Sequence, residues 1–181
     1  METSTKKFTK LQNEMFSLMC KKAGKKLSQR EIANNLGVSP TAVAKSLILL
    51  DKEGLVKKIK DTRINLIRVE FNRENRKAVY RKRVENIKLI YESDFIDSLE
   101  EKFPGSTIIL FGSYSRGEDL ASSDVDLAVI GCSEKKIILK KYEKFLEREI
   151  RINFFKNLKK IEKEFKESLC NGIVFSGGIE L

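Results

Sequence analysis

The sequence predicts an α+β protein built from two units. Its 181 residues are enough for one ordinary domain or two small ones. The basic excess lies entirely in the first half: residues 1–92 hold 22 Lys and Arg against 10 Asp and Glu, whereas residues 93–181 hold 14 against 16. The first half is patterned as helices followed by two short strands, and the second half alternates helices with apolar strands.

The first half begins with apolar residues at helical spacing. Ser28 is placed to cap a helix, and Glu31 three residues later completes a capping box. Ser39 precedes a proline at the first-turn position of the next helix, where proline is tolerated. The pattern therefore predicts three helices, over residues 7–20, 28–37 and 40–51.

Residues 27–56, LSQREIANNLGVSPTAVAKSLILLDKEGLV, resemble the helix-turn-helix of winged-helix DNA-binding proteins. Two alternating stretches, 56–60 and 64–70, would then form the wing. The resemblance implies that residues 1–71 bind duplex DNA, with the helix that begins at Pro40 in the major groove. The expected contacts to DNA are Thr41, Lys45 and Ser46 from this helix, with Ser39 and Arg63 at phosphate or the minor groove. A winged helix used only for protein contacts or dimerisation remains the alternative, although the net charge of +12 over residues 1–92 favours DNA.

Residues 72–93 are expected to form a basic connecting helix. Apolar residues recur along it at helical spacing, at Tyr80, Val84, Ile87 and Tyr91. This apolar side could pack across both units or against its copy in a homodimer. The charge run could be a solvated face or a DNA contact, and both alternatives stay open. Its basic residues are Arg73, Arg76, Lys77, Arg81, Lys82, Arg83 and Lys88.

The second unit, residues 94–181, centres on a pair of aspartates between two apolar strands. Alternation along a strand puts Asp124 and Asp126 on one face and Val125 in the core. Two adjacent carboxylates repel each other, but hard oxygen ligands at fixed geometry suit Mg²⁺. Upstream, Gly112 offers backbone N–H groups to which a triphosphate can approach closely. The flanking pattern predicts helices over 94–102, 137–147 and 157–170 and strands over 108–111, 127–130, 149–155 and 172–175.

Gly112-Ser113, ten intervening residues and Asp124-x-Asp126 resemble the motif of the DNA polymerase beta type nucleotidyltransferases. The fuller strings FGSYSRGE and SDVDLAV resemble the minimal nucleotidyltransferase branch of that superfamily. The resemblance covers residues 95–181 and implies a small α/β domain with a mixed sheet. It further implies transfer of a nucleoside monophosphate from an NTP to an acceptor, for which family analogy offers a protein or a tRNA.

The resemblance also assigns roles to residues. Asp124 and Asp126 would be catalytic and would hold Mg²⁺ (or Mn²⁺), while Gly112, Ser113 and Arg116 would bind the nucleotide. None of these roles needs a histidine, and the chain has none.

The family normally supplies a third carboxylate from the strand after the intervening helix. Along residues 149–155 the position aligned with it is Asn153, an amide that carries no charge. A shift of two residues would place Arg151 there instead. Two functions therefore stay open: a DNA-tethered nucleotidyltransferase with an altered metal site, and a DNA-binding transcriptional regulator whose domain has lost chemistry and senses a nucleotide or a partner.

Composition excludes several other classes of protein. Without histidine, and with three cysteines at no metal-ligand spacing, a zinc site or a histidine-assisted nucleophile is not expected. No apolar run approaches the length of a membrane span, and the N-terminus lacks the core of a signal peptide. We therefore expect a cytoplasmic protein with no membrane partner.

Overall fold

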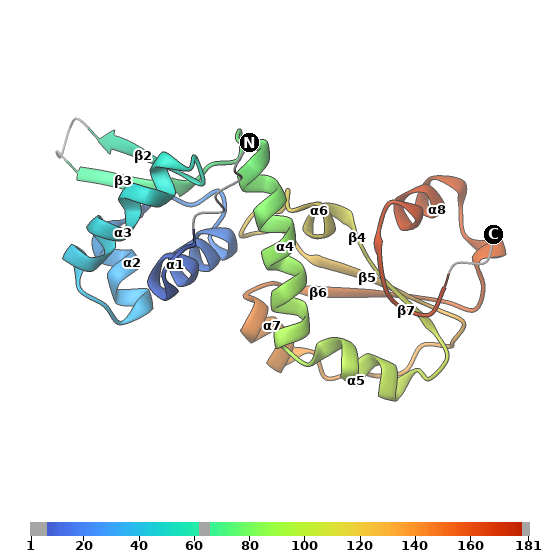
Figure 1. Ribbon diagram of the computed structural model, residues 1–181. Coiled ribbons are helices and arrows are strands. Elements are labelled where there is room, and N and C mark those ends of the chain that lie inside the picture. The colour runs from blue at the N-terminus through green and yellow to red at the C-terminus, as the bar shows by residue number, and fades with distance from the viewer. Residues whose placement is uncertain (1–6, 62–65, 179–181) are drawn as a thin grey trace. The chain divides into compact units, whose positions relative to one another are not determined.

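The computed structural model describes residues 7–61 and 66–178, and the chain divides into two compact units, Met1–Val79 and Tyr80–Leu181. The described part of the first unit holds three helices and a small antiparallel sheet (Figure 1). The sheet has the strand order β1-β3-β2. Three helices with a short strand after the first and a two-stranded hairpin after the last make the winged-helix architecture. The elements are α1 (Lys10–Lys21), β1 (Leu27–Ser28), α2 (Gln29–Leu36), α3 (Pro40–Lys52), β2 (Val56–Asp61) and β3 (Leu66–Phe71).

Two predicted helix starts are confirmed in this unit, whereas the helix expected from residue 7 begins at Lys10. Ser28 Oγ accepts from the Glu31 backbone N–H at 3.2 Å, and a Glu31 carboxylate oxygen accepts from the Ser28 N–H at 2.7 Å. Ser39 Oγ accepts from the Ala42 N–H at 3.2 Å, which caps α3. Strand β1 was not predicted, because only two residues form it and their pairing with β3 is a tertiary contact.

The second unit is built on a four-stranded sheet of order β6-β5-β4-β7. Strands β5 and β6 run parallel and the other neighbours run antiparallel, so the sheet is mixed, as predicted. Residues 80–92 of α4 belong to this unit. Its elements are α4 (Arg76–Glu92), α5 (Phe95–Lys102), β4 (Thr107–Phe111), α6 (Gly112–Arg116), β5 (Val125–Ile130), α7 (Lys140–Leu146), β6 (Ile150–Phe155), the 3-10 turn η1 (Leu158–Lys160), α8 (Lys163–Cys170) and β7 (Ile173–Ser176).

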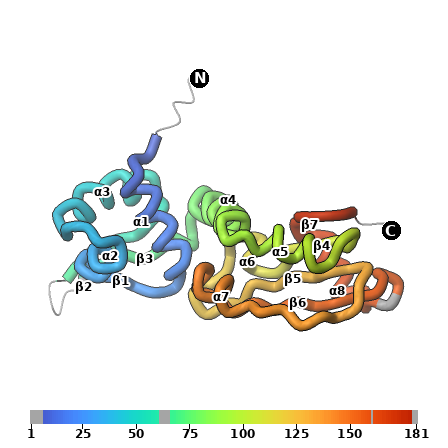
Figure 2. Tube along the Cα trace, turned by 90° about the horizontal axis from the view of Figure 1, so that it is seen from below, coloured from blue at the N-terminus to red at the C-terminus, as the bar shows by residue number. Residues whose placement is uncertain are grey.

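Alternating side chains of the central strands supply two separate cores on the two faces of this sheet. On one face Ile108 and Leu110 of β4 pack with residues of α4, α5 and α7. On the other face Ile109 and Phe111 pack with residues of α8. Figure 2 shows β5 and β6 of this sheet side by side. Burial on both faces explains why residues 108–111 of β4 and 127–130 of β5 are continuous apolar runs rather than alternating ones.

Two helices of this unit are shorter than the sequence predicts. The helix expected over residues 157–170 begins only at Lys163, because Ile161 is extended after the 3-10 turn. The helix expected over 137–147 spans Lys140–Leu146. Among the described residues, no helix has the length and apolarity needed to cross a bilayer.

Candidate functional site

The two aspartates flank the first residue of β5. Val125 is fully buried, whereas Asp124 and Asp126 are both partly exposed on the same side of the strand end. Burial raises the pKa of Asp126 above its ordinary value, the Asp124 carboxylate raises it further, and the Arg151 guanidinium partly offsets both effects. The carboxylates are therefore close enough to repel each other, and a cation between them would relieve the repulsion.

The Gly112 backbone lies directly against one of these carboxylates. Phe111 pairs with Asp126 across β4 and β5, which brings the end of β4 beside the acids. Gly112 has φ +75°, and a Cβ built on it would lie 2.7 Å from Asp126 Oδ2. A side chain at this position would be both strained and in collision with the carboxylate. Glycine thus lets the turn and the acidic pair form one site.

The other two predicted nucleotide ligands lie on the short helix α6 that follows the turn. Ser113 is partly exposed, and Ser115 Oγ donates to the Gly112 carbonyl at 2.8 Å, which holds the turn. Arg116 is exposed and its Nε donates to a Glu118 carboxylate oxygen at 2.7 Å. Its guanidinium is therefore shared with a neighbouring acid.

The strand register decides which residue lies beside the acids. Across the parallel strands β5 and β6, Asp126 pairs with Arg151, and Ala128 pairs with Asn153. Asn153 instead donates its Nδ2 to the Leu127 carbonyl at 3.4 Å. The register therefore brings the residue two positions before Asn153 beside the acids. Arg151 occupies that position, and its Nη2 contacts Asp124 Oδ2 at 2.9 Å.

Residues 92–176, just under half of the chain, match the family model described as "Nucleotidyltransferase domain". This stretch holds the glycine turn, both aspartates and Arg151. Residues 92–176 form a nucleotidyltransferase domain. No curated protein matches the chain.

Solved structures similar to the chain include ZitR, AdcR and MepR. ZitR of Lactococcus lactis in complex with DNA is 24% identical, with 56% of this chain and 66% of that chain covered and a TM-score of 0.41. The adhesin competence repressor AdcR of Streptococcus pyogenes is 20% identical (56% and 72% covered, TM-score 0.42). MepR of S. aureus in complex with DNA is 16% identical (52% and 77% covered, TM-score 0.39). The chain thus spans just under two thirds of ZitR, and the assignment of the N-terminal fold rests on its own helices and strands.

The acids of the nucleotidyltransferase domain do not fit a two-metal site of three carboxylates. Within residues 7–61 and 66–178, no group of three or more His, Cys, Asp or Glu side chains could hold a metal ion. The donor set is two carboxylates with one guanidinium ion-paired to Asp124. A guanidinium has no lone pair to offer a metal, so Arg151 cannot replace the missing ligand.

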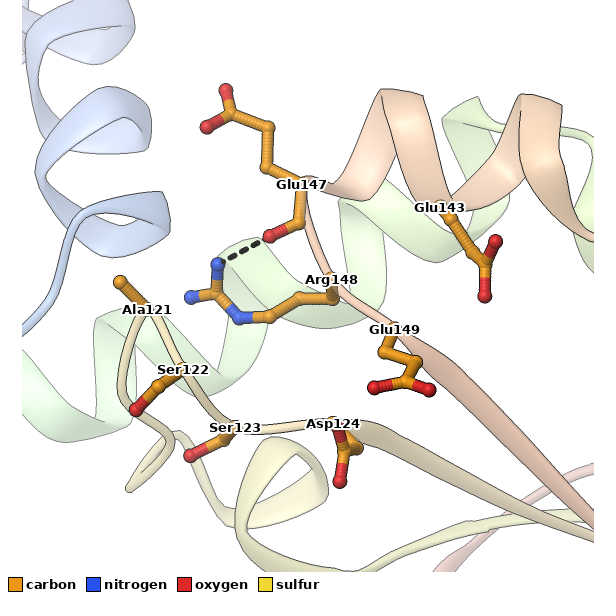
Figure 3. Close-up of a pocket in the computed structure, with 8 residues that line it drawn as sticks. All are labelled: Ala121, Ser122, Ser123, Asp124, Glu143, Glu147, Arg148 and Glu149. Carbon is orange, nitrogen blue, oxygen red and sulfur yellow. Dashed lines mark hydrogen bonds between the residues drawn. The ribbon is translucent and has the colours of Figure 1, made fainter.

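A cavity of about 520 Å³ opens beside Asp124 within the same domain. Figure 3 shows Asp124 and Glu149 with Glu143 on one side of this cavity, and the Arg148 side chain extending toward the loop at Ala121. The Arg148 guanidinium donates to the Glu147 carbonyl at 2.9 Å. The cavity therefore has a largely acidic wall next to the acidic pair.

A buried charge network fixes the loop that carries the acids. Asp119 is 2% exposed, and its carboxylate pairs with Lys82 of α4 and accepts from Arg148 Nη2 at 3.1 Å. Asn86 donates to the same carboxylate at 2.8 Å and to the Tyr114 carbonyl at 2.9 Å. Lys82 had been counted among the basic surface residues of the connecting helix, but its side chain is completely buried. Sequence spacing carries no signal for this network, because its members come from two helices and two loops that are far apart in the sequence.

The predicted DNA contacts of the first unit lie on and around α3. Thr41 and Lys45 are exposed, Ser46 is half-buried, and Ser39 is exposed with its hydroxyl engaged in the cap of α3. Arg63 lies outside the described residues. Sequence reasoning missed Ile48, which is 62% exposed and follows Thr41 and Lys45 at helical spacing. The sequence does carry a signal for an exposed Ile48, because this residue does not lie on the apolar side of the helix that Val43, Leu47 and Leu50 define.

Proposed function

We propose that the chain is a DNA-binding regulator whose nucleotidyltransferase domain binds a nucleoside triphosphate and does not transfer it. The triphosphate would arrive with Mg²⁺ or Mn²⁺ and bind between the glycine turn and the acidic pair. The observation that carries the proposal is Arg151 opposite Asp126, at the position where a transferase of this family needs a carboxylate.

Nucleotide binding is supported by the contact between Gly112 and Asp126. A phosphate chain can lie against a backbone that bears no side chain, beside carboxylates that hold its cation. In this proposal Gly112 and Ser113 bind phosphate oxygens, and Asp124 and Asp126 bind the cation that accompanies the nucleotide. Arg116 would neutralise phosphate charge after exchanging its Glu118 partner for the nucleotide.

The absence of transfer follows from the charge at the third position. Transfer in this family uses carboxylates to hold the metal that activates the acceptor hydroxyl. The guanidinium of Arg151 presents only N–H donors, so it can serve neither as metal ligand nor as base. The test is to incubate the wild type and Arg151→Asp with labelled ATP or GTP and a cell extract. Label on an acceptor with Arg151→Asp only would support the proposal, whereas equal labelling by the wild type would contradict it.

Nucleotidyl transfer is the second candidate function. It is supported by the acidic pair Asp124 and Asp126 and by the Gly112 backbone that lies against Asp126. The acceptor would be a protein or a tRNA. In that case the wild type labels an acceptor, and the double variant Asp124→Ala/Asp126→Ala does not.

Duplex DNA is the proposed partner of the winged-helix unit. The support is the net charge of +12 over residues 1–92 and the exposed side chains of α3. Ile48 would add an apolar contact, such as one to a thymine methyl group. Thr41, Lys45 and Ser46 are the proposed contacts in the major groove, and Ser39 and Arg63 the contacts to phosphate or the minor groove.

A homodimer is proposed through the outer side of α4. Tyr80, Val84 and Tyr91 are each more than half exposed there, and Ile87 lies at the same helical spacing. Residues spaced by four, three and four along a helix form the seam by which two helices pack together. Light scattering measures the outcome: Val84→Glu is expected to shift a dimer toward the monomer.

A further inference from the structure

The cation nearest to the acidic pair is part of the chain itself. Arg151 is the register partner of Asp126, and its Nη2 is 2.9 Å from Asp124 Oδ2. The same guanidinium lowers the otherwise raised pKa of Asp126, so it acts on both carboxylates. A positive group at this place does what a bound cation would do, because it relieves the repulsion between two acids fixed one residue apart.

The charge balance of the site differs accordingly from that of a three-carboxylate site. Two carboxylates and one guanidinium carry a net charge of −1, whereas three carboxylates would carry −3. Affinity for hard divalent cations depends strongly on the number of charged ligands. This site is therefore expected to bind divalent cations more weakly than a site of three carboxylates would.

The ion pair between Arg151 and Asp124 is also exposed enough to solvent for either partner to be displaced. The side chain of Arg151 is 62% exposed and that of Asp124 is 21% exposed. Ion pairs this accessible are weak, because water solvates both partners. A divalent cation or a phosphate group can therefore displace one partner from the other, and the planar guanidinium is well suited to phosphate oxygens.

We propose that Arg151 is the resident cation of this site: its guanidinium and a divalent ion compete for Asp124. With the ion on Asp124, the Arg151 guanidinium would be free to contact the phosphates of the nucleotide. The competition concerns the metal alone, and only the phosphate contact rests on the proposed nucleotide-binding function. Arg151 thus sets the concentration of divalent cation at which the site becomes occupied.

The test measures Mn²⁺ binding to the full chain without nucleotide, from the electron paramagnetic resonance signal of free Mn²⁺. The variants are Arg151→Gln, Arg151→Asp and Arg151→Lys. Arg83→Gln and Arg83→Asp are matched controls, since Arg83 is an exposed arginine of α4 whose loss changes the total charge equally. Because Arg151 is exposed, its variants are expected to keep the circular dichroism spectrum of the wild type.

Arg151→Gln is expected to bind Mn²⁺ about five-fold tighter than the wild type, the factor that an exposed ion pair is worth. Arg151→Asp is expected to gain about ten-fold or more by adding a ligand, and Arg151→Lys and both Arg83 variants to stay within about two-fold. The proposal is overturned if Arg151→Gln binds Mn²⁺ no tighter than Arg83→Gln, or if no variant binds Mn²⁺ at all. Failure of ATP to bind the wild type would instead remove the proposed function and leave the competition for Asp124 standing.

Discussion

Asp126 and Arg151 lie opposite each other in two parallel strands, although 25 residues separate them in the sequence. This pairing places a guanidinium beside the two carboxylates that are proposed to bind a cation. The proposed nucleotide site therefore combines the Gly112 backbone and two carboxylates with a guanidinium in place of a third acid. The consequences can be measured residue by residue.

Gly112→Ala is expected to abolish nucleotide binding, because the new Cβ would lie 2.7 Å from Asp126 Oδ2. The matched control is Gly105→Ala, since Gly105 has the same backbone strain, at φ +76°, but nothing within 4 Å of its built Cβ. Both variants should lose about 1 kcal/mol of stability from the positive φ. Calorimetry with Mg-ATP separates them: binding retained by Gly112→Ala, or lost equally by Gly105→Ala, would contradict the site.

Asp119→Ala is expected to destabilise the protein by about 3–5 kcal/mol, because it leaves Lys82 and Arg148 buried without their counter-ion. Urea unfolding followed by circular dichroism measures the change. Glu118→Ala removes the neighbouring acid, which is paired with Arg116 at the surface, and should cost less than about 1 kcal/mol. Equal costs for the two variants would show that the buried network does not hold the loop.

Asp126→Asn is expected to stabilise the folded protein at neutral pH by about 0.5 kcal/mol. Burial and the Asp124 carboxylate raise the pKa of Asp126, so folding favours its protonated form. Protonated Asp126 therefore contributes to stability at a pH below its pKa in the unfolded protein. This contribution is lost as the pH rises through its pKa in the folded protein. Thermal unfolding at pH 7 and below about pH 3 measures this, since the gain should vanish in acid. Glu134→Gln, at an exposed position, is the control. A gain in the stability of Asp126→Asn that persists in acid would contradict relief of charge repulsion as its cause.

Lys45→Ala is expected to weaken binding to duplex DNA and to lower the salt dependence of the binding constant by about one unit. Lys45 is an exposed residue of α3, the helix proposed to enter the major groove. Lys144→Ala removes an exposed lysine of α7 in the other unit and serves as the control. Fluorescence anisotropy at several salt concentrations distinguishes them. An unchanged salt slope for Lys45→Ala would remove α3 from the interface.

The fold was predictable where local rules decide the structure. Ser28 with Glu31, and Ser39 before Pro40, mark helix starts that the structure reproduces, because capping depends on residues three apart. The apolar runs around the acidic pair became the central strands for a similarly local reason. Strand β1 could not be predicted in this way, because it is defined by the pairing of Leu27 with Val69, a residue distant in the sequence.

The site was predictable only in part, and the limit is the strand register. Gly112, Asp124 and Asp126 belong to one continuous motif, so their spacing alone brought them together. Arg151 lies on a separate strand, and a shift of two residues along that strand keeps the same alternation of faces. Nothing local distinguishes Arg151 from Asn153, and the hydrogen-bonded pairing with β5 decides between them.

A calorimetric titration of Mg-ATP and Mg-GTP into the full chain tests the proposed nucleotide site directly. The wild type is expected to bind both nucleotides, and Asp124→Ala/Asp126→Ala is expected to lose this binding. Because the aspartates are partly exposed, the double variant should remain folded, which circular dichroism checks. A wild type that binds neither nucleotide, or a double variant that binds as tightly as the wild type, would contradict the claim that this turn and these acids form a nucleotide site.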